Sequence, residues 1–324
     1  MDVSQSGPSP EMKAERPVSN RRQFIQAAGI LPATIVAARN AIPGAAAENG
    51  RTSLPQIRLG SYSISRLICG ANPFNAGSHL SVFVNHQMRE YYTPDQILRT
   101  LRRCEEVGIN CWQSGTKNID LYRRYVDEGG KMHFLAIAAG DEAEIAMLAR
   151  GGCIGIAHHG EVSDQLFKTG KLEAMHDYLK RVRDAGLLVG VSTHMPAVVD
   201  AVESKGWDID YYMTCVYERH RSKEDLEKLL GQAPIPVGEV YLPQDPLRMF
   251  KVIQQTKRTC LAFKILAAGR LSERQQWVEE AFRRTCESIK PQDGMIVGIY
   301  DRYSDQPAQD AELVRRFSTA GKSI

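Results

Sequence analysis

Residues 153–161 have the sequence CIGIAHHGE, in which five small or apolar residues lead directly into His158, His159, Gly160 and Glu161. A short apolar run of this kind predicts a strand that is buried on both faces, as in a parallel sheet. Polar residues at the carboxyl end of such a strand are where a parallel α/β barrel carries its chemistry. The segment therefore predicts both a barrel and the edge at which its reactive residues gather.

The same pattern recurs eight times after residue 65: a short apolar run, a polar turn and an amphipathic helical stretch. Eight such units over about 250 residues predict a (β/α)8 TIM barrel. A doubly wound sheet and a two-domain chain are the competing interpretations. No Gly-x-Gly-x-x-Gly motif follows the first predicted strand, which weakens the doubly wound alternative. We expect residues 48–64 to form a linker with a first short strand or hairpin, and residues 65–324 to form the barrel.

The composition is that of a soluble globular protein, with 43% hydrophobic and 24% charged residues among 324. A formal net charge of +3 gives no strongly basic face of the kind that nucleic-acid-binding proteins carry, and no polybasic membrane patch. The seven cysteines are an odd number, widely spaced and without a Cys-x-x-Cys pair. They predict buried small hydrophobic side chains rather than a disulfide framework.

The N-terminal segment predicts an export signal. Arg21 and Arg22 precede an apolar stretch, residues 27–38, and small residues close the segment at 44–47. A charged start, a short apolar middle and a small-residue end are the parts of a secretion signal, and the paired arginines resemble a bacterial twin-arginine signal. We expect residues 1–47 to direct the chain through the twin-arginine (Tat) export machinery to the periplasm or beyond, without a stable membrane anchor. An ordinary signal or an amphipathic helix is the alternative.

Several segments, taken in order along nearly the whole mature chain, resemble the aldo/keto reductase superfamily. They are LICGANPF (67–74), EEVGINCWQSG (105–115), VGVSTHM (189–195), KILAAGRL (264–271) and MIVGIYDR (295–302). Their order and spacing carry the resemblance. It implies a TIM barrel that acts on the carbonyl or hydroxyl group of a small molecule with a nicotinamide cofactor, NAD(P).

The catalytic tetrad of that superfamily is incomplete in this chain. The family uses an Asp after strand two, a nearby Tyr that gives a proton to the carbonyl, a Lys on strand three and a His that ends strand four. His158 matches the last position, whereas Gln113 occupies the Asp position. Residues 114–119 contain no Tyr, and the third strand, HFLAIAAGD, contains no Lys. An uncharged Gln cannot tune a neighbouring proton, so the proton relay of the family is unsupported.

The cofactor side of the family pattern is better matched. The resemblance implies that Ser192 bonds the nicotinamide amide, that Thr193 replaces an Asn beside it, and that Tyr217 stacks on the nicotinamide ring. Gly269 and Gly298 fit the loops near the pyrophosphate. No arginine matches the family residue that grips the 2′-phosphate of NADP, and the nearest ones, out of register, are Arg270 and Arg302.

Histidines and carboxylates at several strand ends suggest a second chemistry. His159, His194 and Glu161 are a ligand set that suits Zn or Mn, although His-His-x-Glu is no established metal motif. Alternate residues of a strand face opposite ways, so His158 and His159 cannot both point into the barrel mouth while the strand continues. We expect one to be a site residue and the other to pack. Each histidine can equally be a hydrogen-bonded structural residue.

Lys264 lies in an apolar predicted strand, AFKIL, where a lysine must be either paired or used. It suits a general base, a Schiff-base former or an anion clamp. The alternative is a salt bridge within the barrel to Glu239 or Asp141. A long segment, Asn75–Tyr92, mixes polar and aromatic residues and predicts either a loop that shapes a pocket for a carbohydrate-like ligand or a solvated loop.

Three functional hypotheses follow. The first is an exported aldo/keto reductase-like oxidoreductase with a nicotinamide cofactor and a small, sugar-like substrate. The second is a lyase, isomerase or hydrolase on a carbohydrate-like substrate, with Zn or Mn as an optional metal. The third is a binding protein without catalysis, because the tetrad is incomplete. For an enzyme, the expected catalytic residues are His158, His194, Lys264, Gln113 and Glu161.

Overall fold

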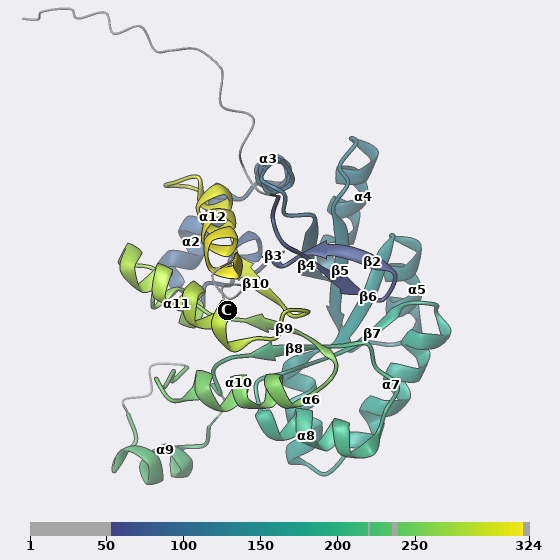
Figure 1. The fold of residues 1–324 in the computed structure, drawn as a ribbon. Helices are drawn as coiled ribbons and strands as arrows, with labels where there is room; N and C mark the ends of the chain where they lie inside the picture. The colour runs from purple at the N-terminus through teal and green to yellow at the C-terminus, as the bar shows by residue number, and fades with distance from the viewer. Residues whose placement is uncertain (1–52, 220, 235–238, 320–324) are drawn as a thin grey trace, which may run out of the picture. The chain divides into compact units, whose positions relative to one another are not determined.

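The computed structural model describes residues 53–219, 221–234 and 239–319. Eight parallel strands close into a barrel in the order β10-β3-β4-β5-β6-β7-β8-β9, and helices lie outside it (Figure 1). This arrangement confirms the predicted (β/α)8 TIM barrel. The predicted signal at residues 1–47 lies outside the described residues.

The barrel strands are short. They are β3 (Leu67–Gly70), β4 (Cys111–Gly115), β5 (His133–Ala138), β6 (Cys153–His158), β7 (Leu188–Thr193), β8 (Tyr211–Cys215), β9 (Thr259–Phe263) and β10 (Gly294–Gly298).

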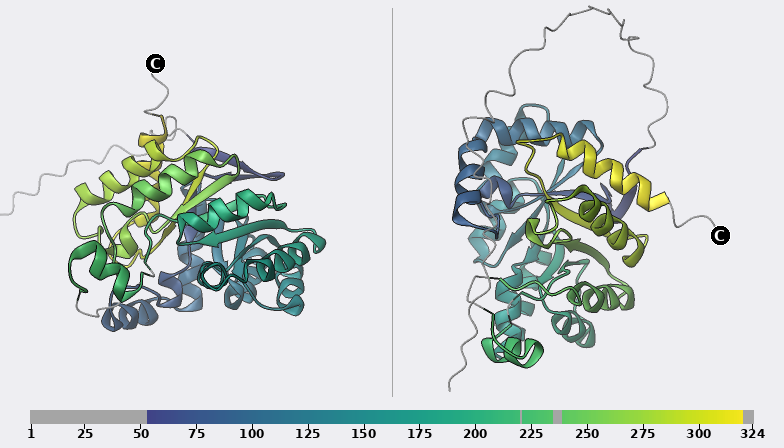
Figure 2. Two further views of the ribbon diagram at one scale, coloured as in Figure 1. Left: turned by 90° about the horizontal axis from the view of Figure 1, so that it is seen from below. Right: turned by 90° about the vertical axis from the view of Figure 1, so that its left-hand side faces the viewer.

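The helices that follow these strands surround the barrel (Figure 2). They are α2 (Val82–Tyr91), α3 (Pro94–Glu106), α4 (Ile119–Asp127), α5 (Glu142–Arg150), α6 (Gly160–Lys168), α7 (Leu172–Asp184), α8 (Pro196–Lys205), α9 (Lys223–Leu230), α10 (Asp245–Gln255), α11 (Gln275–Ser288) and α12 (Gln306–Thr319). In the part of the chain that the structure describes, no helix is long and apolar enough to cross a bilayer.

Local sequence explains where these helices begin. The Thr93 hydroxyl accepts a hydrogen bond from the Gln96 amide, and Pro94 occupies the first turn of α3, as the sequence predicts. Two helices were not expected. Ser81 caps α2 inside the segment interpreted as a loop, and α6 begins directly after β6. Both helices are short, so the spacing of their few apolar residues does not distinguish them in the sequence from a polar loop.

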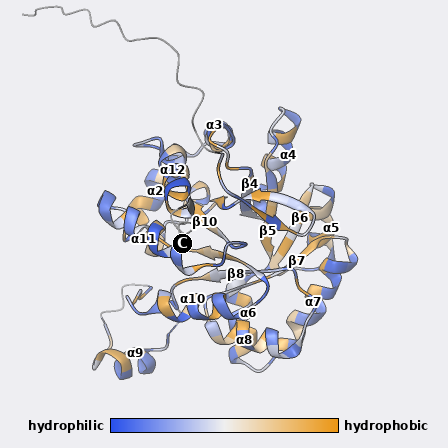
Figure 3. Cartoon of the chain, in the orientation of Figure 1, coloured by the Kyte–Doolittle hydropathy of each residue, from blue (hydrophilic) through white to orange (hydrophobic). Residues whose placement is uncertain are grey.

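Two apolar layers hold the barrel. An outer layer lies between strands and helices, and an inner layer fills the barrel. Figure 3 shows hydrophobic colour on much of the barrel strands, whereas the helices mix hydrophobic and hydrophilic residues. An antiparallel hairpin, β1 (Gln56–Leu59) and β2 (Tyr62–Ser65), lies where the sequence predicted a first short strand or hairpin, and it contributes Ile57, Leu59 and Ile64 to the inner layer. Because these side chains pack with the inward residues of the barrel strands, the hairpin is part of the barrel core. The functional groups must therefore lie at the other end of the strands.

We predict that Ile64→Ala lowers the free energy of unfolding by about 2–5 kcal/mol, because Ile64 is fully buried in the inner layer. Arg58→Ala, on the exposed face of the same hairpin, is the matched control and should change it by no more than about 0.5 kcal/mol. Urea unfolding of both variants measures the difference. Equal effects would mean that the hairpin does not help to hold the barrel interior together.

Candidate functional site

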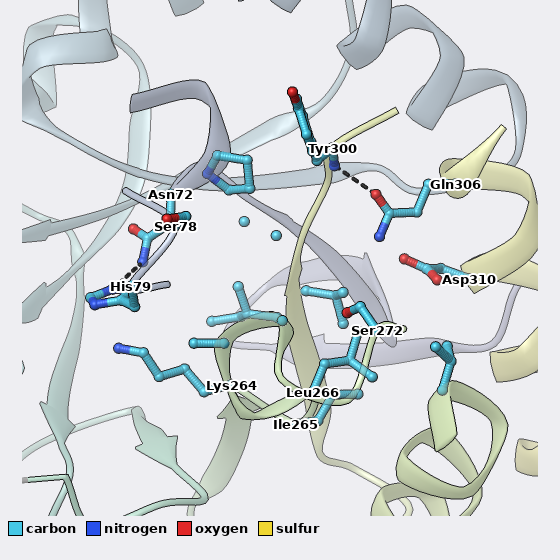
Figure 4. A pocket seen from close by; sticks show the side chains of 18 of the residues that line it. Asn72, Ser78, His79, Lys264, Ile265, Leu266, Ser272, Tyr300, Gln306 and Asp310 are labelled. Carbon is cyan, nitrogen blue, oxygen red and sulfur yellow. Dashed lines mark hydrogen bonds between the residues drawn. The ribbon is translucent and has the colours of Figure 1, made fainter. Parts of the chain in front are cut away.

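A cavity of about 450 Å³ opens at the carboxyl ends of β3, β4, β9 and β10. It extends to the first turns of α11 and α12 (Figure 4). Four of the expected site residues line it: Gln113, Lys264, Gly269 and Gly298. Its size is within the range of small-molecule and cofactor pockets. This end of the barrel is the one at which the sequence predicted the chemistry.

Lys264 follows β9 and extends its amine along the cavity wall (Figure 4). Burial lowers the pKa of Lys264 to about 8; the positive charges of Arg219 and Arg270 also lower it, whereas Cys215 and Glu161 oppose the shift. The amine makes no hydrogen bond or ion pair with any residue that the structure describes.

The salt-bridge alternative for Lys264 was therefore wrong for both suggested partners. Glu239 is held by His79, Arg219 and Tyr241, and Asp141 accepts the Glu144 amide as the N-cap of α5. A buried lysine without an ion-pair partner among the described residues is a candidate functional residue, because no opposite charge in direct contact offsets the cost of its burial.

The backbone after β9 is strained. Lys264, Ala267 and Ala268 have φ values of 60°, 49° and 52°, in the left-handed region that side chains with a Cβ rarely adopt. Such residues cost about 1–3 kcal/mol each and concentrate at functional sites. The loop that carries Lys264 and ends at Gly269 is thus held in place by the surrounding structure rather than by its own preference.

A charged network lies beside the lysine. Glu239 accepts from the Tyr241 hydroxyl at 2.6 Å and faces His79 Nδ1 at 2.9 Å, while Arg219 pairs with both Glu161 and Glu239. These residues come from three separate segments: the turn before α2, the start of α6 and the region after β8. The network therefore fixes the loops around the mouth relative to one another.

His79 is neutral in this network. Its pKa is lowered to about 4, mainly by burial and then by the positive charges of Lys264 and Arg219. Its Nε2 lies 3.2 Å from the Asn72 side-chain amide, which can donate to it, while Nδ1 donates to Glu239. His79 is thus a hydrogen-bonding residue at the mouth and, at neutral pH, adds no charge to it.

The structure separates His158 from His159. His158 pairs across the sheet with Ala138 and Val191, both in the outer layer, and its Nδ1 lies 2.7 Å from the Ser163 hydroxyl of α6. Burial, and secondarily His159, lowers the pKa of His158 to about 4. Its imidazole packs between the strands and the helices, so this placement gives no support to the expected catalytic role of His158.

His159 is the inward imidazole. Its amide bonds the carbonyl of Ala138, so the extended backbone continues one residue past β6 and its side chain shares the face of Ala157, an inner-layer residue. The register shift between Cys153 and Gly155 in the pairing of β6 with β5 produces this alternation. The Nδ1 atom of His159 is buried and has no hydrogen-bond partner among the described residues.

His194, Thr193 and Asp164 form a second buried cluster. The Asp164 carboxylate lies 2.8 Å from His194 Nδ1 and accepts the Thr193 hydroxyl at 2.5 Å. Burial lowers the pKa of His194, and Asp164 opposes that shift. Thr193 thus points toward α6, and its expected place beside the cofactor amide was wrong.

Ser192 lies on the inner side of β7, fully buried, and its hydroxyl has no partner among the described residues. A Cβ added at Gly160 would lie 3.0 Å from that hydroxyl and 3.1 Å from His194 Cε1, so a larger residue there would push these side chains by a few tenths of an ångström. Ser192 does not line the large cavity.

Tyr217 lines a different, smaller cavity of about 330 Å³. Its ring packs on Tyr241 with centroids 5.2 Å apart, and Phe250 and Trp277 complete the aromatic wall. Tyr217 does not line the large cavity, so this arrangement gives no support to its expected stacking on a nicotinamide ring at the barrel mouth.

The suggested metal set is not assembled. In residues 53–219, 221–234 and 239–319, no three His, Cys, Asp or Glu side chains converge as ligands. Glu161 pairs with Arg219, and His194 is bonded to Asp164, which separates the three expected ligands. The structure thus gives no support to a Zn or Mn site made by His159, His194 and Glu161.

Three residues of the mouth were missed or undervalued by the sequence interpretation: Arg219, Tyr241 and His79. These residues lie in segments that connect strands and helices and that carry no recognisable sequence motif. Only the contacts of the folded chain bring them together. Asp310 was also missed, because in sequence it is one more acidic residue on an amphipathic helix.

No known protein family matches the sequence, and no curated protein does. Solved structures match the fold. A putative aldo-keto reductase from Pseudomonas aeruginosa is 14% identical over 83% of this chain and 97% of its own, with a TM-score of 0.51.

Two further structures score lower. A phospho-2-dehydro-3-deoxyheptonate aldolase from Thermotoga maritima is 13% identical over 83% of this chain and 74% of its own, with a TM-score of 0.49. A glycerol dehydrogenase from Gluconobacter oxydans is 12% identical over 84% of this chain and 98% of its own, with a TM-score of 0.46. At 14% identity, the likeness to the Pseudomonas aeruginosa structure shows the TIM-barrel fold and no more.

We predict that His158→Gln reduces the acid sensitivity of the fold. An ordinary histidine, with a pKa of 6.5 in the unfolded chain, takes up a proton before the buried His158, with a pKa of about 4, does. Wild-type stability from this group is therefore present above pH 6.5 and is lost as pH falls toward 4. Urea unfolding at pH 7 and pH 5 should show a smaller difference for the variant.

The exposed His86→Gln is the control and should leave the pH difference unchanged. An unaltered difference in His158→Gln would contradict the burial of a neutral His158 in the folded chain.

Proposed function

We propose that the chain is an aldo/keto reductase-like oxidoreductase that acts on the carbonyl or hydroxyl group of a small molecule at the barrel mouth. The observation that carries the proposal is Lys264. It lies where the cavity reaches the mouth, with a lowered pKa and without an ion-pair partner among the described residues. It supplies the proton donor that the incomplete tetrad lacks.

The outer part of the cavity fits the dinucleotide portion of a nicotinamide cofactor. Gly269 and Gly298 bring backbone to the cavity wall, and α12 begins at Gln306 on its rim, where helix amides favour a phosphate group. Bound there, NAD(P) would supply or accept a hydride. The ring end of the family pattern fits less well, because Ser192 and Tyr217 lie outside this cavity.

Lys264 can act as the general acid. With a pKa of about 8 it is mostly protonated at pH 7, and it donates one proton from Nζ to the carbonyl oxygen as the carbon is reduced. In the oxidative direction the neutral amine takes the hydroxyl proton back. Asn72, Gln113 and neutral His79 line the same cavity and are hydrogen-bonding groups that can orient the substrate oxygen.

We predict that Lys264→Met lowers kcat/KM for carbonyl reduction by about 10²–10⁴-fold, the usual contribution of a general acid. NADH and NADPH oxidation by the purified chain, assayed with a panel of small aldehydes and ketones, measures the loss. The wild-type rate should fall as pH rises above about 8, because the amine then loses its proton.

The exposed Lys251→Met is the matched control and should keep the wild-type rate. Isothermal titration with the nucleotides should show unchanged binding in Lys264→Met. Full activity in that variant, or no nucleotide binding by the wild-type chain, would refute the proposal.

Schiff-base chemistry is the second candidate, and the same lysine favours it. A lowered pKa leaves a fraction of neutral amine at pH 7, which can add to a carbonyl carbon and release water to form an imine. Borohydride reduction in the presence of pyruvate or glyceraldehyde would then leave a stable adduct on Lys264, detectable by peptide mass spectrometry. Such labelling without nucleotide binding would favour a lyase over an oxidoreductase.

We also propose export through the twin-arginine pathway, supported by the sequence pattern at Arg21 and Arg22. Replacing both by lysine keeps the charge but removes the paired guanidinium groups. Fractionation of a bacterial host should then find the full chain inside the cytoplasm. Arg39→Lys, outside the pair, is the control, and export of the double variant would overturn this proposal.

A further inference from the structure

A buried carboxyl group lines the end of the large cavity that is farther from Lys264. Asp310 on α12 is 2% exposed, and its side chain lies among the cavity-lining groups near Gln306 (Figure 4). Its Oδ2 atom has no hydrogen-bond partner in the part of the chain that the structure describes. Burying an unpartnered carboxyl costs free energy, so native proteins retain such a group where a bound molecule or another function satisfies it.

No cation described by the structure is paired with this carboxyl. The two arginines nearest to the family's phosphate-binding position are engaged elsewhere. Arg270 stacks on Tyr241, 4.1 Å from the ring centroid, and Arg302 lies over Tyr91 and donates to the Gln87 carbonyl. Burial alone raises the pKa of Asp310 to about 8. Apart from the amides at the start of α12, the described residues that line this end of the cavity offer oxygen acceptors and no positively charged side chain.

We infer that Asp310 recognises a hydroxyl group of the bound dinucleotide and makes the chain select NAD(H) over NADP(H). This inference rests on the proposed function, because the reactive end of the cofactor must lie near Lys264 and its adenosine end is then directed toward α12. A ribose 2′-hydroxyl can donate to the Asp310 carboxyl group where it lines the cavity. The 2′-phosphate of NADP(H) would instead bury two negative charges beside this neutral carboxyl group, and no arginine among the described lining residues would neutralise them.

The test is the ratio of the two affinities in the wild-type chain and in Asp310→Asn, by isothermal titration with NADH and NADPH. The wild type should bind NADH at least about tenfold more tightly, the value of one good hydrogen bond. Asp310→Asn should lower that ratio by a similar factor. Asp305→Asn, whose carboxylate pairs with Arg103 and does not line the cavity, should leave the ratio unchanged.

Equal binding of the two nucleotides by the wild type, or an unchanged ratio in Asp310→Asn, would overturn the inference while leaving the proposed function intact. Binding of neither nucleotide would overturn both. A change of the ratio in Asp305→Asn as large as that in Asp310→Asn would also overturn the inference, because the effect would then be one of general charge.

Stability provides a second readout that does not depend on activity. The folded chain holds a proton on Asp310 up to pH about 8, whereas the unfolded chain releases it near the ordinary value of 3.8. The wild type therefore loses stability from this group as pH rises from 4 to 8. Asp310→Asn should lose less between pH 5 and pH 8.5 in thermal melts, which also shows that the variant folds. An identical pH dependence would contradict the buried, unpartnered state of this carboxyl.

Discussion

The alternation of side chains across eight closed strands is the constraint on which the other features of this protein depend. Each strand residue must enter either the barrel interior or the layer beneath the helices. The hairpin β1–β2 packs Ile57 and Ile64 into the interior, and polar residues occupy the carboxyl ends of the strands. The same constraint assigns every polar residue at those ends to the mouth or to the outer layer.

A shift of one residue in the register of β6 against β5 shows how much depends on this constraint. The sequence predicted the barrel, its strand at 153–158 and the rule that only one of His158 and His159 faces inward. It favoured His158, whereas the structure turns His159 inward, because the shift at Gly155 depends on pairing with β5 and leaves no mark in the local sequence. The apolar runs were enough to predict where the strands lie. The side of the sheet on which each imidazole lies depends on how β6 pairs with β5 in the folded chain.

Charge at the mouth depends on segments that no motif marks. Arg219 is held between Glu161 and Glu239, and Glu239 also takes the hydrogen bonds of His79 and Tyr241. Both carboxylates are thereby occupied, so neither pairs with Lys264. The sequence indicated that this lysine must be paired or used, and only the folded contacts distinguish the two. Connecting segments thus determine the state of the residue that the barrel positions.

Lys264 and Asp310 pose the same physical problem with opposite charges. Each is an ionisable group whose pKa is moved by burial toward the neutral form, and each lines one cavity without an ion-pair partner among the described residues. Pairing them with each other would remove both costs, but they lie toward opposite ends of the cavity (Figure 4). A ligand that spans the cavity and meets an amine at one end and a carboxyl at the other would offset both costs at once. The separation of the two groups therefore favours an elongated ligand over a compact one.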